Sequence, residues 1–519
     1  MQQSLIRILI CFIFCLNIAH SQTLKFSPHE MKSKMAINLM ERYADGYWAY
    51  QETEGGMGMS GDYLNYNLEM MPGKLYNRHT VEPSPSYFLS VSFWNNKFNY
   101  LYESYKKKYY RLYLGREGAE PLFIDSILYS PSFINTELLS FASKGYDFIP
   151  LEDKKSFLLI HNTYYSKNKK EGGIEKAYII RDGGTSPDSV FDLKKPEIPP
   201  EMEGEMVFDY KFGKLISQTH VLDPLTDLTE HRKIKLRRIS GNKSLEATDT
   251  NRKRSKLKTS QLKYTFTDMK TGKEAKLEIP GIEGSYYHSF NTTYGEDHSV
   301  TVSGLYVSAD KKAKFYPGYY SYSIDMETAV LKRSIITPLN APGLAQFEVI
   351  RSVKGEKRTV SDFIEMSDGS KLCIIECYSP GPAGDYRMMG NMPVNYFNIY
   401  VLSFDKEGNY QWAVEINRKT TIKEGNILTY QSVPRFFNDT YNAFVGKDQV
   451  HIYFNDEEQA WDYAFSEKGK ISTKSLNALA GADVKKFVLF PQGGMQVSDT
   501  EMLIPCHKND KSTLVKISY

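Results

Sequence analysis

Cysteine is scarce in this chain of 519 residues, which contains only five. Cys11 and Cys15 lie near the N-terminus, and Cys373, Cys377 and Cys506 lie in the rest of the chain. Three thiols are too few for a disulfide scaffold, so a hydrophobic core must hold the fold together. Cys373 and Cys377 fall in a strand-like run, where a separation of about 13 Å prevents a bond between them. We expect buried thiols at both rather than a metal half-site, and a bond from Cys506 to either one stays open.

Excess charge of one sign is also missing. The chain has 65 Lys and Arg residues against 62 Asp and Glu residues, which leaves a net charge of +3. Such a balance gives no global attraction to nucleic acid or to an anionic membrane. We therefore predict no nucleic-acid partner.

The sequence has no recognised metal-binding motif. Apart from His20 there are nine His residues, and none forms a His-x-His or His-Glu-x-x-His pattern, so zinc chemistry is not indicated. Acidic residues gather at 455–458 and Asp462, and residues 437–439 repeat the start of that group. They lack the ordered Asp-x-Asp-x-Asp-Gly loop of a calcium site, which favours a solvated acidic turn. We predict no metal and no cofactor.

Long hydrophobic runs are limited to one near the N-terminus. Residues 8–19 are apolar and follow Arg7, but these roughly 12 residues are fewer than the about 20 that a membrane-spanning helix needs. Small residues stand three and one before Gln22, which is the pattern of a secretory signal peptide. We predict a signal peptide at residues 1–21, cleavage after Ser21, and no transmembrane segment in the mature chain. The protein is then secreted, to the periplasm or the cell surface.

Aromatic residues are plentiful. They make up 13% of the chain, with 38 Tyr, and the 41% hydrophobic and 24% charged fractions are those of a globular protein. From about Tyr87 onward, short runs rich in Val, Ile, Tyr and Phe alternate with Gly, Asp, Asn and Lys clusters, which predicts strands. Long amphipathic helices between these runs are lacking, which favours antiparallel sheets joined by hairpins. Clear examples are residues 157–160, 176–180, 299–303, 397–404 and 450–454.

One helix is predicted directly after the signal peptide. Ser27 and Pro28 provide a capping residue and a proline at the first helical position, with Glu30 three residues after the cap. Apolar residues spaced by three and four continue one face to about Tyr50. The glycine-rich residues 55–61 then end any regular element and serve as a linker.

A recurring turn is the most informative pattern. An extended run meets a short polar stretch, usually with Asp or Ser and usually closing on Gly, and another extended run follows. Six copies at irregular steps predict an all-β protein, a β-propeller of six to eight antiparallel blades, with stacked β-sandwiches as the alternative. The domains are then the signal peptide at 1–21, the helix and linker at 22–61, and the propeller at 62–519. The copies are at residues 112–118, 207–213, 266–272, 323–328, 403–408 and 465–469.

Residues 397–412 read Phe-Asn-Ile-Tyr-Val-Leu-Ser-Phe-Asp-Lys-Glu-Gly-Asn-Tyr-Gln-Trp, and Glu-Ile-Asn-Arg-Lys follows at 415–419. This stretch resembles a family of uncharacterised secreted β-propeller-like proteins of Gram-negative bacteria, in which a strand ending in Asp-x-x-Gly leads to a strand with Trp and then a basic residue. Residues 318–325 and 452–457 look like the preceding and following blades, and the likeness covers roughly residues 286–519. It implies a propeller and an envelope address, but no activity.

Asp405, Gly408 and Trp412 are also similar to the Asp, Gly and Trp of quinoprotein propeller repeats. Their spacing occurs once in this chain, whereas a repeat architecture would show it in several blades. We expect no quinone cofactor.

A basic segment at residues 232–258 is the strongest local charge feature. It contains eleven Lys and Arg residues but only two acidic residues, Glu246 and Asp249. Such a segment can contact an anionic glycan, a lipid phosphate or nucleic acid by releasing counterions. The alternative is a solvated insertion between two strands. The candidate binding residues are Arg237, Arg238, Arg252, Lys253 and Arg254.

No catalytic residue is identified. Residues 58–61 fall one position short of a Gly-x-Ser-x-Gly elbow, and carboxylates from distant blades could still pair. Tyr pairs could stack on sugars, although Tyr also suits a half-buried sheet surface. We expect a non-catalytic propeller of the cell envelope that binds a protein or a glycan, rather than an enzyme. The alternative is a carbohydrate-active hydrolase or lyase with carboxylates at the propeller channel. The ligand, the blade count and the oligomeric state stay open.

Overall fold

The computed structural model divides into two compact units. Unit 1 comprises Met1–Gly56, Ser60–Leu75 and Phe436–Tyr519, and unit 2 comprises Met57–Met59 and Tyr76–Arg435. The structure describes residues 22–519 except for 33–36, 44–45, 53–60, 78–85, 95–96, 107–108, 117–118, 129–143, 154, 164–174, 194–202, 223–233, 240–241, 248–259, 309–315, 341–343, 345–357, 381–393, 419, 423–440, 447–448, 457–458, 467–468 and 510.

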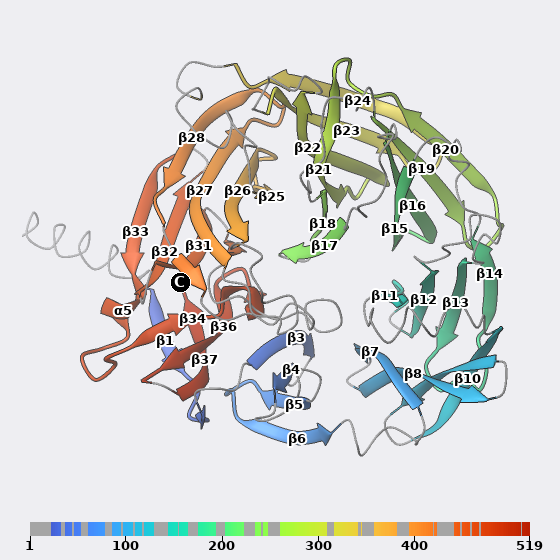
Figure 1. The fold of residues 1–519 in the computed structure, drawn as a ribbon, viewed down its shortest axis with the longest axis horizontal. Helices are drawn as coiled ribbons and strands as arrows, with labels where there is room; N and C mark the ends of the chain where they lie inside the picture. The colour runs from blue at the N-terminus through green and yellow to red at the C-terminus, as the bar shows by residue number, and fades with distance from the viewer. Residues whose placement is uncertain are drawn as a thin grey trace, which may run out of the picture. The chain divides into compact units, whose positions relative to one another are not determined.

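Unit 1 joins the two ends of the chain. Strand β1 (Thr23–Phe26) pairs antiparallel with the last strand, β37 (Lys511–Ser518), and β2 (Met31–Lys32) pairs with β37 as well. Figure 1 shows β1, in blue, beside the red β37. The sheet that contains the C-terminus is therefore completed by the first described strand of the chain.

Two sheets make up unit 1. One is four-stranded in the order β3-β4-β5-β6, and the other has ten strands. The ten-stranded sheet consists of β30–β33 and of β34–β37 with β1 and β2, and these two groups meet at a single parallel pair, Gln459 with Phe487. The elements are β3 (Ile37–Tyr43), β4 (Gly46–Glu52), β5 (Gly61–Asn67), β6 (Pro72–Asn77), β30 (Asn442–Val445), β31 (Gln449–Asp456), β32 (Gln459–Ser466), β33 (Ile471–Ser475), α5 (Leu476–Leu479), β34 (Phe487–Leu489), η6 (Pro491–Gly493), β35 (Met495–Ser498) and β36 (Glu501–Lys508).

Unit 2 contains five antiparallel sheets, in the orders β10-β9-β8-β7, β11-β12-β13-β14, β15-β16-β19-β20, β17-β18-β21-β22-β23-β24 and β25-β26-β27-β28, with β29 on β27. The strands are β7 (Ser86–Trp94), β8 (Lys97–Lys106), β9 (Tyr109–Arg116), β10 (Ala119–Leu128), β11 (Lys144–Pro150), β12 (Ser156–Thr163), β13 (Glu175–Arg181), β14 (Ser189–Leu193), β15 (Glu203–Lys211), β16 (Lys214–Leu222), β17 (Ile234–Ile239), β18 (Asn242–Ala247), β19 (Ser260–Asp268), β20 (Glu274–Ile279), β21 (Ser285–Tyr294), β22 (Ser299–Ser308), β23 (Gly318–Asp325), β24 (Val330–Pro338), β25 (Arg358–Glu365), β26 (Lys371–Pro380), β27 (Val394–Phe404), β28 (Tyr410–Ile416) and β29 (Thr420–Ile422). The prediction of a nearly all-β chain with many small antiparallel sheets is confirmed.

Consecutive sheets of unit 2 share their apolar faces. In β12, Phe157 and Leu159 pack with the β7–β10 sheet, while Leu158 and Ile160 pack with the next sheet along the chain. Side chains alternate between the two faces of a strand, so a strand covered on both faces reads as a continuous apolar run. This is why residues 157–160 are uninterrupted Phe-Leu-Leu-Ile.

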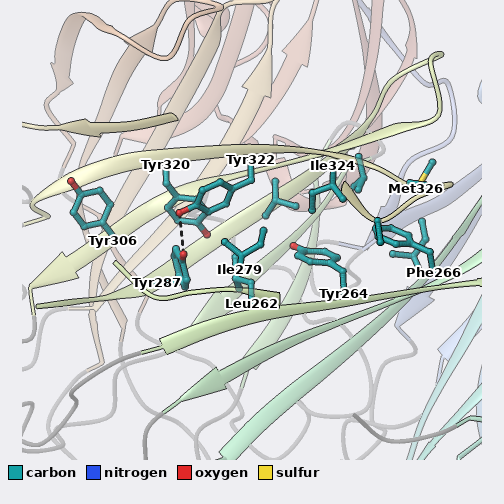
Figure 2. Packing of buried hydrophobic residues seen from close by; sticks show 14 residues of the cluster. Leu262, Tyr264, Phe266, Ile279, Tyr287, Tyr306, Tyr320, Tyr322, Ile324 and Met326 are labelled. Atoms are coloured by element: carbon teal, nitrogen blue, oxygen red, sulfur yellow. Dashed lines mark hydrogen bonds between the residues drawn. The ribbon is translucent and has the colours of Figure 1, made fainter. Parts of the chain in front are cut away.

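The core between the sheet of β15, β16, β19 and β20 and the six-stranded sheet that contains β21–β24 is rich in tyrosine. Figure 2 shows Tyr264, Tyr287, Tyr320 and Tyr322 packed together, with Ile324 and other aliphatic side chains beside them. The hydroxyls of Tyr287 and Tyr322 lie 3.0 Å apart, and Tyr287 also donates to the Pro280 carbonyl at 2.8 Å. Six of the fourteen buried residues of this cluster are aromatic. Their rings contribute large apolar areas, and the paired hydroxyls avoid the cost of burying a polar atom alone.

The recurring polar turns join consecutive antiparallel strands, as predicted. Asp268 closes the β19–β20 turn, because its Oδ1 accepts hydrogen bonds from the backbone N–H of Lys270 and Thr271 at 3.0 and 2.8 Å. Asp325 does the same in the β23–β24 turn, where the N–H groups of residues 327 and 328 donate at 2.9 Å. Each turn then needs one residue with positive φ, which is Gly272 at 70° in the first and Ala329 at 54° in the second.

The predicted helix after residue 27 is wrong. The described residues between 22 and 52 form β1 to β4 instead, and the Ser27 hydroxyl donates to the Met70 carbonyl at 2.7 Å rather than capping a helix. Residues spaced by four lie on one face of a regular strand as well as on one face of a helix, so the spacing of the apolar residues did not separate the two. Long-range strand pairing therefore overrides the local helix signals, which are weak.

Three further predictions meet the structure in different ways. Cys373, Cys377 and Cys506 are free and buried, and the first two lie in β26, as predicted. Residues 55–60 of the predicted linker lie outside the described residues, Gly61 begins β5, and the flanking strands β4 and β5 pair with each other. Among the described residues, no helix is long and apolar enough to cross a membrane.

Candidate functional site

The basic segment contains a hairpin that extends a neighbouring sheet. Strands β17 and β18 follow β16 in the chain, yet β18 pairs with β21, so they add to the six-stranded sheet rather than to the sheet of β15, β16, β19 and β20. The predicted site residues Arg237 and Arg238 lie on β17. The predicted site residues Arg252, Lys253 and Arg254 lie outside the described residues.

The register of this hairpin places one like-charged pair and one oppositely charged pair across its strands. Arg238 pairs with Lys243, whereas Lys235 pairs with Glu246 and Arg237 pairs with Ser244. Two cations at directly opposed positions destabilise an antiparallel pair. β17 is also the edge of its sheet, and Lys or Arg on an edge strand hinders pairing with other chains. The hairpin therefore carries a net positive charge at the edge of its sheet.

Unit 1 contains a buried polar cluster around Asp462, which sequence analysis missed. Its side chain is 2% exposed, and His451 Nδ1 lies 3.0 Å from Oδ1. Tyr519 OH and Gln22 Nε2 donate to Oδ2 at 3.0 and 2.9 Å, and Tyr453 OH contacts Tyr519 OH. Burial and the neighbouring Tyr453 and Asp462 raise the pKa of Tyr519 far above its ordinary value. These hydrogen bonds satisfy carboxylate oxygens that burial removes from water.

Two residues of the acidic group at 455–458 and Asp462, which we expected to form a solvated turn, are buried instead, while Glu457 and Glu458 lie outside the described residues. Asn455 is fully buried and donates to the Leu489 carbonyl at 2.8 Å, while its Oδ1 accepts from the Leu489 N–H at 2.9 Å. Asn455 and Asp462 thus hold strands together, whereas Asp456 is half-buried. Residues 437–439 lie outside the described residues. Sequence could have suggested the His–Asp contact only from the register of β31 and β32, which needs the turn length between them.

A buried ion pair lies in the β25–β29 sheet. Arg418 Nη2 donates to Glu376 Oε1 at 2.7 Å, and the two side chains are 0% and 1% exposed. Arg418 Nε also donates to the Phe397 carbonyl at 3.2 Å. Removing one partner from such a pair leaves an uncompensated buried charge. Arg418, the basic residue that follows Trp412 in the stretch described above, is therefore part of the core of this sheet.

A polar row crosses the interface between the β21–β24 sheet and the β25–β29 sheet. Asn291, Ser303 and Ser321 are register partners on adjacent strands and are 2%, 2% and 6% exposed. The hydroxyls of Ser303 and Ser321 lie 2.9 Å apart, and Lys371 Nζ donates to Ser303 Oγ at 2.8 Å. A lysine amine beside two buried hydroxyls is unusual in a sheet interface that is otherwise apolar.

The described residues contain no group of three or more His, Cys, Asp or Glu side chains that could hold a metal ion. Asp125 is an example of an acidic side chain that accepts hydrogen bonds from neighbouring side chains. Its Oδ2 accepts from Lys176 Nζ at 2.8 Å and from Tyr178 OH at 2.7 Å. These hydrogen bonds lower the pKa of Asp125 although burial opposes the shift.

No protein-family model and no curated protein matches the chain. Solved structures do match. A prolyl endopeptidase has a TM-score of 0.41 at 9% identity, with 93% of this chain and 55% of that chain covered, so the chain spans about half of its length. A DUF4221 family member from Bacteroides vulgatus matches with a TM-score of 0.33 at 10% sequence identity, and the match covers 88% of this chain and 98% of that one. The polysaccharide lyase Uly1 matches with a TM-score of 0.36 at 10% sequence identity, and the match covers 95% of this chain and 99% of that one. At these scores none of them assigns a family or an activity, and the resemblance to secreted propeller-like proteins stays a prediction.

Proposed function

We propose that this chain is a secreted β-propeller of the cell envelope, a non-catalytic binding module whose β17–β18 hairpin binds an acidic glycan. The signal peptide at residues 1–21 would send it to the periplasm or the cell surface. The glycan ligand follows from the cationic hairpin in an otherwise nearly neutral chain.

Eight blades account for the sheets. Each sheet of unit 2 contains a core of four antiparallel strands, which gives five blades, and the β3–β6 sheet gives a sixth. The ten-stranded sheet supplies two more, since its groups β30–β33 and β34–β37 with β1 share only one parallel pair. In this proposal β1 completes the last blade and ties the two ends of the chain together.

The observation that carries the binding role is the placement of the hairpin. The chain leaves one sheet after β16, adds β17 and β18 to the edge of the next sheet, and returns as β19. Arg237 and Arg238 lie on the outer strand of that edge, with Lys243 opposite Arg238. A register that opposes two cations costs stability, and an anionic ligand that bridges them would remove the repulsion.

Retention on a heparin column tests this proposal. The variant with Arg237, Arg238, Arg252 and Arg254 all changed to Gln should elute at clearly lower salt than the wild type, because fewer counterions are released on binding. The matched control changes Lys25, Lys276, Lys406 and Lys511 to Gln, which removes the same charge from side chains that are 58–68% exposed. The control should elute close to the wild type. Equal elution of both variants would contradict a role for the hairpin.

A screen for glycan cleavage separates binding from catalysis. The wild-type protein is incubated with sulfated and uronic-acid polysaccharides, and new reducing ends and unsaturated products are measured. A binding module leaves the polymer length unchanged. Cleavage that persists in the hairpin variant would instead favour a carbohydrate-active hydrolase or lyase whose site lies elsewhere in the chain.

A further inference from the structure

Two aromatic side chains from neighbouring sheets stack on each other at hairpin turns of unit 2. Phe212 lies in the β15–β16 turn and His298 in the β21–β22 turn, and their ring centroids are 4.5 Å apart with an angle of 15° between the planes. Phe212 is half-buried and packs against the tyrosine-rich core, whereas the His298 side chain is 49% exposed. Phe212 therefore supports the imidazole ring from below while that ring stays accessible to solvent.

Both residues have an unfavourable backbone conformation. The φ angle is 50° at Phe212 and 58° at His298, in the left-handed region that bulky side chains rarely adopt. Lys211 pairs with Lys214, so Phe212 and Gly213 form a two-residue hairpin loop, for which Asn-Gly is a usual sequence. Local turn chemistry thus favours Asn at position 212 and Gly or Asn at position 298. Residues held in such conformations cluster at active sites and ligand-binding sites.

Two exposed carboxylates flank the stacked pair. Glu152 in the β11–β12 turn accepts a hydrogen bond from the Phe212 N–H at 2.7 Å. Glu327 in the β23–β24 turn is 54% exposed, and its Oε1 lies 3.6 Å from His298 Nδ1. The His298 carbonyl also accepts from the Met326 N–H at 3.1 Å, which fixes the turn. Turns of three consecutive sheets therefore converge on one exposed ring.

The charges around this ring nearly balance. Lys214 Nζ lies 2.9 Å from Glu327 Oε2 and 4.0 Å from Asp268 Oδ2. Lys211 Nζ lies 5.2 Å from the centroid of the Phe212 ring. A charged ligand gains little from surroundings that contain both signs in similar number. Hydroxyl groups, by contrast, can donate to the carboxylates and accept from an ammonium group.

We propose that His298, supported by Phe212, is a stacking platform for a pyranose ring of a neutral glycan. Glu152 and Glu327 accept hydrogen bonds from hydroxyls of that ring. The C–H face of a pyranose is apolar and packs on a flat aromatic ring, while its hydroxyls need polar partners at the rim. The site shares no residue with the β17–β18 hairpin. It goes beyond the binding of an acidic glycan and does not rest on it, because an uncharged glycan gains nothing from counterion release.

Affinity gel electrophoresis of the full mature chain tests this site. The gels contain an uncharged β-glucan, xylan, mannan or galactan, and the dissociation constant is obtained from the retardation of the protein. We expect at least one polymer to retard the wild type. His298→Asn removes the ring but tolerates the left-handed backbone, and it should weaken that binding about fivefold or more. Retardation by none of these polymers, or equal retardation of wild type and variant, would overturn the proposal.

The hairpin provides the matched control for the ligand. The variant with Arg237 and Arg238 changed to Gln should bind the neutral polymer as the wild type does, because the platform is unchanged. A loss of binding in this variant as large as that in His298→Asn would place the neutral glycan at the hairpin and refute the platform.

Urea unfolding separates the binding role from a purely structural one. His298→Asn relieves an unfavourable backbone conformation, so its unfolding midpoint should equal or exceed that of the wild type although it binds the glycan less well. Ala329→Gly relieves a φ of 54° in the β23–β24 turn and should leave the retardation unchanged. A midpoint of His298→Asn below that of the wild type would show that the ring is retained for stability and would contradict the proposal.

Discussion

At the scale of single residues, two buried tyrosines of the tyrosine core differ in the hydrogen bonding of their hydroxyls. Tyr264 is 1% exposed, and its hydroxyl has no hydrogen-bond partner among the described residues. Tyr287 is equally buried, but its hydroxyl contacts Tyr322 and the Pro280 carbonyl. The ring of each residue contributes apolar area, whereas only the hydroxyl of Tyr287 recovers the cost of leaving water.

Substitution by phenylalanine should therefore affect the free energy of unfolding differently at these two positions. Tyr264→Phe is expected to leave the free energy of unfolding unchanged or to raise it, because it removes an unpaired buried hydroxyl. Tyr287→Phe should lower it by about 1 kcal/mol, because it leaves the Pro280 carbonyl without that donor. Urea unfolding of the two variants measures the difference. A loss at position 264 as large as that at 287 would show that the Tyr264 hydroxyl is paired.

Lys371 gives the protein a pH-dependent stability. Its pKa is about 8 in the folded chain and about 10.4 in an unfolded one, so the unfolded state binds more protons between these values. Stability from this group therefore rises with pH from about 8 to 10. Above about pH 10 the trend reverses, because buried tyrosines such as Tyr66 and Tyr102 have pKa values raised to about 12 and resist ionisation only when folded.

The comparison with Lys371→Met isolates this contribution. Between pH 7.5 and 9.5 the wild type should gain about 1 to 2 kcal/mol relative to the variant, as measured by denaturant unfolding at each pH. The ionising tyrosines are common to both proteins and cancel in the difference. Parallel stability curves over this range would mean that the amine keeps an ordinary pKa.

At the scale of elements, strands and turns could be read from the sequence because their signals are local. The Asp-Met-Lys-Thr-Gly turn after β19 and the Asp-Met-Glu-Thr-Ala turn after β23 both follow from a side chain that closes onto its own backbone. The N-terminal strands could not be read in this way. β1 pairs with residues 515–518, so its structure depends on contacts almost 500 residues away in sequence.

The difference between local and long-range signals also explains which parts of the candidate site could be predicted from the sequence. The charges of Arg237 and Arg238 were evident from the sequence, but their placement on an added edge strand was not, since it depends on which sheet β18 joins. The contact between Lys371 and Ser303 joins two sheets and has no local pattern at all. Side-chain chemistry is a property of sequence, whereas proximity is a property of sheet order and register.

The turn after β19 offers a direct test of the backbone argument. Gly272 has a φ of 70°, and an added Cβ would meet no atom within 4 Å. Gly272→Ala should therefore cost about 1 kcal/mol purely through the left-handed backbone, and Gly272→Asn should cost less because Asn tolerates that conformation. Thermal unfolding of both variants measures this. Equal losses, or none, would contradict the backbone explanation.

At the scale of the whole molecule, the chain consists of two units that each bury their own apolar clusters. Unit 1 unites the N-terminal and C-terminal strands through β1 and β37, and Gln22 from the N-terminal segment reaches the buried Asp462. Unit 2 stacks consecutive sheets through shared cores, and it contains the cationic hairpin. In the proposed function, unit 2 presents these added strands to the ligand.

The salt dependence of binding to a sulfated oligosaccharide tests the central proposal most directly. Changing Arg237, Arg238 and Lys243 to Gln should weaken binding and reduce the slope of log affinity against log salt by about one unit per lost contact. Changing Lys25, Lys276 and Lys406 to Gln removes the same charge and should leave the slope near that of the wild type. If the hairpin variant and this control show the same affinity and the same slope, the hairpin is not the binding site.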